Sequence, residues 1–271
     1  MDGILSKVQR FSINLSTETY LLILTLRANG ESSYRDAAAF HRLFKNKYGT
    51  KHIHIITDTH ARALKGLDDC YTFVQKKIEL LDTIRTFVKN IPDGGSLLFC
   101  VSAHGYSKYV AERSTFELNN RTEYLQIGAE HILDTELFDS LYKDMKMSVR
   151  SLCLIDTCHS GTMLDLEFLS HDGIIFRRSN TPLKQRPQSV SISACTDDES
   201  AGEDISSYGG WGGKLTCHVL DYVFRLNGNT LYAWDLYISI RKAFLLRGAH
   251  EGVRSSIIGA ATTHPIISYN C

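Results

Sequence analysis

Short apolar runs alternate with amphipathic segments along most of this chain. Residues 21–26 and 52–56 are predicted to form strands. Residues 36–48 and 74–88 carry apolar side chains at every third or fourth position, which is typical of amphipathic helices. Strands that alternate with helices of this length imply right-handed crossovers and a parallel sheet, so the pattern predicts an α/β fold.

The second half of the chain continues the alternation after a polar stretch at 107–130, which is predicted to be a loop or hairpin. Asp134 or Thr135 is expected to cap the next helix, which leads into a strand ending at Cys158. Residues 170–188 are polar and contain two prolines, so they are predicted to be a linker. The elements expected after it are a strand at 189–193, a glycine-rich loop at 209–213, helices at 215–225 and 231–246, and a final strand near 265–267.

Two of the apolar runs end in residues that can carry chemistry. One run leads to His104 and the other leads to Cys158, and each run is followed by small and polar residues. In open α/β sheets, chemistry sits at the carboxyl ends of the strands. A cysteine becomes a thiolate at neutral pH when a base or positive charge lies beside it, and a histidine can supply both. The separation of His104 and Cys158 is close to the ~50 residues of caspase-type peptidases. We therefore predict a nucleophile–base pair.

The residues around Cys158 carry a family resemblance. The run Asp-Thr-Cys-His-Ser-Gly at 156–161, continued by Thr-Met-Leu-Asp-Leu at 162–166, closely resembles metacaspases, and so does the stretch at 191–201. The resemblance extends from about 21 to 268. It implies one caspase-like domain over 1–271, a six-stranded, mostly parallel sheet with helices on both faces. Within it lie a large-subunit-like region at about 15–169, a linker at 170–188 and a small-subunit-like region at 189–271.

The resemblance also implies an activity. Metacaspases are cysteine endopeptidases that cleave after arginine or lysine, so protein or peptide substrates are expected. Cys158 would attack the scissile carbonyl and form a thioester, with His104 as acid and base. The backbone N–H groups of Gly105 and Cys158 match the oxyanion hole of the family.

Substrate preference is predicted from carboxylates. Asp156 lies two residues before Cys158, so strand alternation points it to the same side of the sheet, where it would pair with a cationic side chain. The resemblance implies a pocket of Asp156, Ser102 and Asp36, with Ser33 at a position where the family has cysteine. From the sequence alone, Asp36 is equally an ordinary acid near a helix N-terminus.

Calcium is the metal that the resemblance implies, through four aspartates outside the active site. Asp165 matches one, and Asp134 matches the first of an Asp-Asp pair whose second member is Thr135 here. No aspartate stands at 119–123, where the fourth is expected. Calcium prefers six to eight oxygens with several carboxylates, so we expect that no cofactor is required.

The composition of the chain narrows the classes of function that the sequence can have. The chain has 271 residues, with 30 basic and 30 acidic side chains, so no basic field points to nucleic acid or to an anionic membrane. No apolar run approaches the roughly 18 residues of a membrane span, and the first ten residues lack a signal-peptide pattern. Seven scattered cysteines favour a reducing, cytoplasmic setting. We expect a monomer.

Two other functions would each leave a distinct mark in the sequence. A non-catalytic caspase-fold scaffold would be favoured by loss of Cys158 or His104, and both are present. A redox or metal-binding protein would need a Cys-x-x-Cys pair or a ligand cluster, and Cys153 and Cys158 are spaced wrongly for it. His52 and His54 alternate on a predicted strand without a third ligand at a fitting spacing, so packing roles are expected for them.

Overall fold

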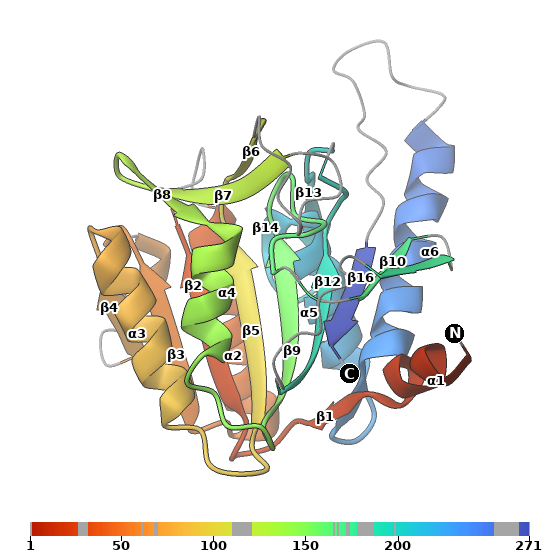
Figure 1. Cartoon of the computed structure of the whole chain (residues 1–271), viewed down its shortest axis with the longest axis horizontal. Coiled ribbons are helices and arrows are strands. Elements are labelled where there is room, and N and C mark those ends of the chain that lie inside the picture. Colours follow the sequence, from red (N-terminus) through yellow and green to blue (C-terminus); the bar gives the residue numbers. More distant parts are fainter. Residues whose placement is uncertain are drawn as a thin grey trace.

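The structure is a computed structural model that describes residues 2–26, 32–60, 62–67, 70–109, 121–164, 166, 168–171, 174–177, 187–197, 199–251 and 266–270. Its centre is one large twisted sheet with helices on both faces (Figure 1). In the described part of the chain this sheet has nine strands, in the order β11-β10-β16-β12-β9-β5-β2-β3-β4.

Six neighbouring strands of the sheet are parallel. They are β4 (Tyr71–Phe73), β3 (His52–Thr57), β2 (Tyr20–Thr25), β5 (Ser96–Ser102), β9 (Arg150–Asp156) and β12 (Gln188–Ser193). The middle strands are buried on both faces, which explains why they are continuous apolar runs rather than alternating ones. The predicted α/β fold with six parallel strands is confirmed.

Three antiparallel strands extend the sheet beyond β12. These are β16 (Ile266–Asn270), β10 (Phe168–His171) and β11 (Ile174–Arg177). The prediction that 170–188 is entirely a linker is wrong in its first part, because β10 and β11 pair there. The apolar triplet at 174–176 is too short to show a period, and β10, with which it pairs, is itself paired with β16, which lies almost a hundred residues away along the chain. Residues 178–186 lie outside the described part.

Helices cover the two faces of the sheet with two separate cores. Alternate side chains of β2 point to opposite faces, so Leu21 and Ile23 join one core and Leu22 and Leu24 the other. The first core contains side chains of α2 (Ser32–Tyr48), α5 (Lys214–Arg225) and α6 (Ala233–Glu251), and the second contains α3 (Lys77–Lys89) and α4 (Asp134–Tyr142). Helix α1 (Asp2–Arg10) lies beside α6, and a short 3₁₀ turn, η1 (Arg62–Leu64), contacts α2.

One predicted helix begins later than its apolar pattern. Val74 donates its N–H to Thr57 O at 2.8 Å and so remains beside the strands. The Glu79 carboxylate accepts the N–H groups of Gln75 and Lys76 at 2.9 and 3.2 Å, and this cap starts α3 at Lys77.

Three small sheets complete the fold. β1 (Ser12–Asn14) pairs with β15 (Thr230–Tyr232), and β13 (Glu203–Ser206) pairs with β14 (Gly210–Gly213). β6 (Gly105–Tyr109), β7 (Arg121–Ile127) and β8 (Glu130–Leu133) form a meander above the carboxyl ends of the parallel strands (Figure 1). The hairpin predicted within 107–130 is confirmed, whereas the loop predicted at 209–213 is wrong, because these glycines form β14.

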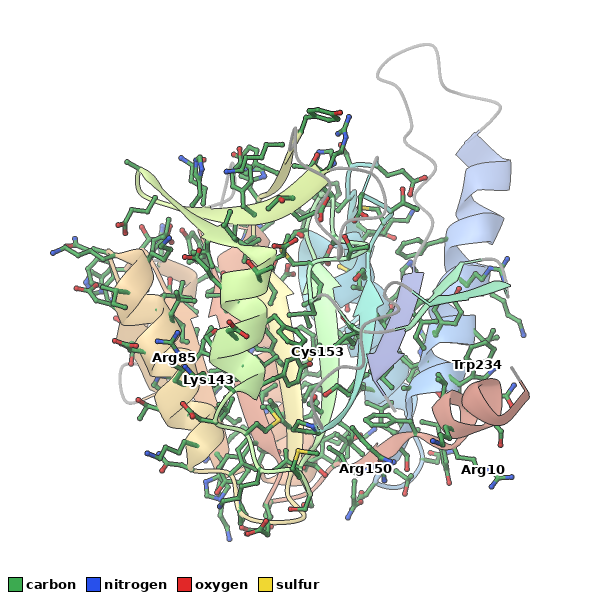
Figure 2. All side chains as sticks on the ribbon, in the orientation of Figure 1. Arg10, Arg85, Lys143, Arg150, Cys153 and Trp234 are labelled. Atoms are coloured by element: carbon green, nitrogen blue, oxygen red, sulfur yellow. The ribbon has the colours of Figure 1, made fainter. Side chains whose placement is uncertain are left out.

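Figure 2 labels two side chains of β9. Arg150 begins the strand and lies 4.8 Å from the Phe11 ring, and Cys153 is buried midway along it. The opposite end of β9 leads to Cys158. None of the helices in the described part of the chain combines the length and hydropathy that crossing a bilayer requires.

Candidate active site

The carboxyl ends of β5 and β9 lie side by side. The two strands are parallel, and their last residues, Ser102 and Asp156, are register partners. His104 and Cys158 each follow two residues later. The adjacency of the two strand ends that the sequence predicts is therefore confirmed.

Gly105 brings the two strand ends into direct contact. A Cβ atom at this position would overlap the Cys158 carbonyl oxygen and lie 2.8 Å from Thr157 Oγ1. Only glycine permits this approach of the segment after His104 to the peptide of Cys158. The absence of a side chain is thus a packing requirement, in addition to any role of the Gly105 N–H toward a substrate.

The turn after Cys158 is held from the loop that follows β12. His159 has a positive φ of 52°, which is uncommon for a residue other than glycine. Its N–H donates to Glu199 O at 3.0 Å, and its Nδ1 lies 2.5 Å from Asp197 O. The His159 ring is thereby held against the loop that follows β12.

The Cys158 sulfur is half-buried and has a backbone partner. The N–H of Ala201 points at Cys158 Sγ at 3.3 Å. Such a donor stabilises the charge of a thiolate more than a neutral thiol. Sequence reasoning did not single out Ala201, because it acts through its backbone and any residue type could supply that group.

The three carboxylate-pocket candidates meet in the interior. Ser102 Oγ donates to Asp36 Oδ2 at 2.7 Å, and the charge of Asp156 acts on Asp36. Asp36 and Asp156 are only 3% and 6% exposed. Asp36 is therefore not an ordinary surface acid of a helix N-terminus, because it is buried against residues of the neighbouring strands.

Backbone donors from the small-subunit side complete this pocket. Gly213 N–H donates to Asp36 Oδ2 at 3.1 Å, and Thr216 N–H donates to Asp156 Oδ2 at 2.8 Å. A Cβ at Gly213 would lie 2.7 Å from the Asp156 Cγ atom. Gly213 and Thr216 are pocket residues that sequence reasoning missed, and the glycine pair before a helix was the available signal.

Burial sets the electrostatics of the two carboxyl groups. It raises the pKa of Asp36 well above the usual value, and the neighbouring charge of Asp156 adds to this. Burial likewise raises the pKa of Asp156 to about 6. The interactions that set these pKa values include no lysine or arginine from the described part of the chain.

The pocket also contains a thiol, although not at the expected place. Ser33, which stands where the family has cysteine, donates to Leu26 O at 3.2 Å. The Cys217 thiol lies 3.6 Å from the position of a Cβ at Gly212, where the same Cβ would overlap the Asp36 carboxylate. Burial, followed by the charges of Asp36 and Asp156, raises the pKa of Cys217 to about 12, so it stays neutral.

The positions considered for calcium are only partly described. Asp134 is buried and accepts the Thr135 N–H at 2.6 Å, but the prediction that Asp134 or Thr135 caps α4 is wrong, because Leu133 is the N-cap and donates its N–H to Glu136. Asp165 lies outside the described residues. Thr162 Oγ1 lies 2.9 Å from the carboxylates of both Glu123 and Asp197. No group of three or more metal-ligating side chains occurs among the residues that the structure describes.

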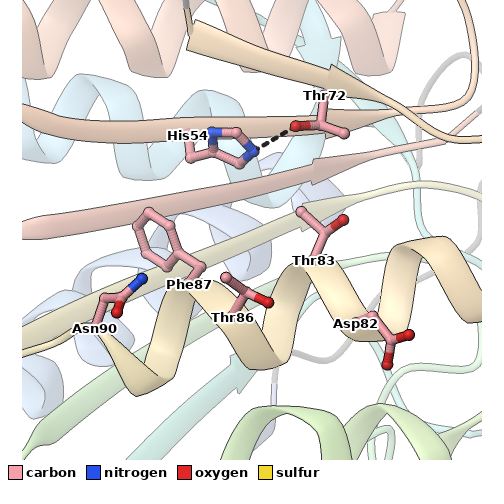
Figure 3. A pocket seen from close by; sticks show the side chains of 7 residues that line it. All are labelled: His54, Thr72, Asp82, Thr83, Thr86, Phe87 and Asn90. Atoms are coloured by element: carbon pink, nitrogen blue, oxygen red, sulfur yellow. Dashed lines mark hydrogen bonds between the residues drawn. The ribbon is translucent and has the colours of Figure 1, made fainter.

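A separate cavity of about 400 Å³ lies between β3 and α3 (Figure 3). His54 lines it and lies 2.9 Å from Thr72 Oγ1, with its ring 5.9 Å from that of Phe87. His52 stacks on Tyr20 with ring centroids 4.3 Å apart. Both histidines have the packing roles that the sequence predicts.

An α/β sheet with a cysteine and a histidine at neighbouring strand ends defines the class of caspase-like proteins. Residues 23–167 match the family model "Metacaspase, peptidase C14 domain". The chain therefore belongs to this family, and the predicted family is confirmed.

Named relatives are consistent with this assignment. Metacaspase-5 of Trypanosoma cruzi (strain CL Brener) is 28% identical over 196 residues, which are 66% of this chain and 43% of that protein. Metacaspase-5 of Trypanosoma brucei brucei is 24% identical over 199 residues, 66% of this chain and 38% of that protein. Metacaspase-1 of Eremothecium gossypii is 32% identical over 106 residues, which are 38% of this chain and 23% of that protein. The chain spans about two fifths of the length of the two trypanosomal relatives.

The fold is also found in a solved structure. A protein from Geobacter sulfurreducens superposes with a TM-score of 0.52 and 15% sequence identity, covering 83% of this chain and 89% of that one. At this identity the similarity concerns the fold alone.

Proposed function

We propose that this protein is a cysteine endopeptidase that hydrolyses peptide bonds after arginine or lysine. The observation that carries the proposal is the buried Asp36–Asp156 pair, which has no described basic partner and lies at the strand end that leads to Cys158. A substrate cation that enters between the two carboxyl groups would neutralise them, and the bond after that residue would then lie at the sulfur.

In the proposed reaction, the Cys158 thiolate attacks the scissile carbonyl carbon and a C–S bond forms. The oxygen of the tetrahedral intermediate is stabilised by the N–H groups of Gly105 and Cys158. His104 then gives its proton to the departing amine, the C–N bond breaks, and a thioester remains. Water attacks the thioester while His104 accepts its proton, the C–S bond breaks, and the acid product leaves as the Cys158 thiolate and protonated His104 are restored.

Calcium is not part of this proposal. Thr135 replaces a carboxylate at one expected ligand position, and the Thr162 hydroxyl already lies between Glu123 and Asp197. The Thr162 hydroxyl has one hydrogen and can donate it to only one of these carboxylates, so the proposal rests on the carboxylate that Thr135 replaces. We propose that Cys158 and His104 act without the metal.

We further propose a cytoplasmic monomer that cuts its own chain. Six cysteines in the described part of the chain are free thiols, which suits a reducing compartment. The segment 178–186 contains Arg178, Lys184 and Arg186, the residue types that the pocket would accept.

The test uses fluorogenic peptides that end in arginine, lysine or aspartate before the reporter. The arginine and lysine peptides should be cut and the aspartate peptide should not. Cys158→Ala and His104→Ala should each lower kcat about a thousandfold or more, without additivity in the double variant. Cys70→Ala, which changes a cysteine far from the strand ends, is the matched control and should retain activity. Turnover by the Cys158→Ala protein would rule out the mechanism.

A further inference from the structure

His104 also lines a cavity on its other side. This cavity has a volume of about 540 Å³, and its walls include Asp58, Thr59, Gln75, His104, Tyr106 and Gln126. Asp58 and Thr59 follow β3, Gln75 precedes α3, and Tyr106 and Gln126 belong to β6 and β7. Two further lining residues, Val74 and Ile127, belong to the core that contains α3 and α4.

The cavity and the carboxylate pocket are lined by different residues. The pocket is built from α2, the ends of β5 and β9, and the start of α5, and the Ser102 hydroxyl donates to Asp36 within it. His104, two residues after Ser102, lines the cavity instead. When the arginine of a peptide occupies the pocket and its scissile bond lies at the Cys158 sulfur, the residues after that bond therefore extend toward this cavity.

The chemistry decides which part of the substrate the cavity meets. The imidazole that protonates the departing amine has to contact the nitrogen of the residue after the scissile bond. That residue consequently lies on the His104 side of the sulfur. The cavity that His104 lines is the available space for its side chain.

The walls of the cavity favour one class of side chain. Asp58 is half-buried and accepts the Tyr34 hydroxyl at 3.1 Å. Gln75 and Gln126 are exposed, and the Gln126 side-chain amide donates to Gly128 O at 2.9 Å. No lysine or arginine occurs among the described residues that line this cavity. We propose that this cavity, given the endopeptidase activity proposed above, binds the substrate residue after the scissile bond, accepts basic or amide side chains there and disfavours acidic ones.

The test uses internally quenched peptides with arginine before the scissile bond and lysine, glutamine or glutamate after it. The wild-type protein should prefer lysine over glutamate by about tenfold in kcat/KM, a discrimination typical of one partly desolvated charge. Asp58→Asn keeps an oxygen for the Tyr34 hydroxyl but removes the charge, so this ratio should fall below about threefold. The ratio within one preparation is independent of the fraction of protein that is folded.

A second variant makes the test independent of Asp58. Gln126 is exposed on β7, and Gln126→Lys should reverse the preference toward glutamate. Thr86→Ala, in the cavity of Figure 3, is the control and should keep the wild-type ratio. If peptidyl-arginine with a fluorogenic leaving group is cut but the three peptides are cut equally well, the cavity assignment is overturned and the endopeptidase proposal stands. If neither substrate type is cut, the endopeptidase proposal is contradicted, and the cavity assignment with it.

Discussion

At the scale of single residues, ionisation of the buried pocket carboxyl groups lowers the stability of the folded protein. Asp36 and Asp156 are buried side by side, and burial raises the pKa of both carboxyl groups. A carboxyl group with a raised pKa in the folded state binds its proton more tightly there than in the unfolded chain. Its contribution to stability is therefore present at low pH and is lost as the pH rises through the pKa of the folded state.

Asp156→Asn tests this cost. Between the usual value of 3.8 and the folded value of about 6, ionisation of Asp156 should lower the free energy of unfolding, by on the order of 1–3 kcal/mol. The amide does not ionise, so the variant should be more stable than wild type at pH 7.5 and equally stable near pH 4. Urea unfolding at both pH values measures this. A variant less stable than wild type at pH 7.5 would contradict the assignment.

The same variant should be a poorer enzyme. Loss of one charged partner of a buried cation costs about 3–5 kcal/mol, so kcat/KM for arginine peptides should fall about a hundredfold or more.

Sequence reasoning found Asp156, Cys158 and His104 because each follows an apolar run. It missed Gly213, whose hydrogen bond to Asp36 spans 177 residues of sequence, since a contact of that range leaves no local pattern.

At the scale of elements, the pocket depends on a strand of glycines. β14 packs against both carboxyl groups, and a Cβ at Gly212 or Gly213 would overlap one of them. Alternation at 52–56 predicted β3, and apolar runs predicted β2, β5 and β9, because buried parallel strands have a continuous apolar signal. They did not predict β14, because glycine lacks side chains that could show a period, nor β10 and β11, whose pairing is set by tertiary contacts.

Gly213→Ala tests the role of β14. Its Cβ would lie 2.7 Å from Asp156 Cγ, so the pocket carboxylate has to move. We expect kcat/KM for arginine peptides to fall at least about tenfold, mainly through KM. Gly202→Ala is the control in the preceding loop, where the nearest atom would be Lys214 Cδ at 3.7 Å, an ordinary contact. Equal activity of the two variants would show that β14 does not shape the pocket.

The region between β7, α4 and the turn after Cys158 bears on calcium. Thr162 links Glu123 to Asp197 there. Activity should survive chelation with EGTA, or should need millimolar calcium to increase. A calcium titration followed by peptide turnover measures this. Half-activation at micromolar calcium would show that other ligands complete a site.

At the scale of the whole molecule, the large and the small region both contribute strands to the central sheet. β11 ends at Arg177, β12 begins at Gln188, and both belong to the central sheet. A cut between these strands would separate the large from the small region while the sheet pairing holds them together. Arg177 itself pairs with Phe168 within β11, which makes it a poorer site than the residues that follow it.

Self-processing should therefore occur after Arg178 or Lys184. Proline follows Arg186 directly, and its nitrogen fits poorly as a leaving group, so that bond should stay intact. Purified wild-type protein, incubated beside Cys158→Ala, should yield fragments whose masses map to these bonds. Wild-type protein that cuts peptides yet remains whole would show that the segment is not a substrate.

Covalent labelling tests the nucleophile and the pocket together. The protein is treated with peptidyl chloromethyl ketones that carry arginine or aspartate, and the modified residue is mapped by mass spectrometry. The arginine reagent should alkylate Cys158, at a rate at least about a hundredfold above that of the aspartate reagent, and His104→Ala should slow it. Labelling of another cysteine, or equal rates for the two reagents, would contradict the proposed active site.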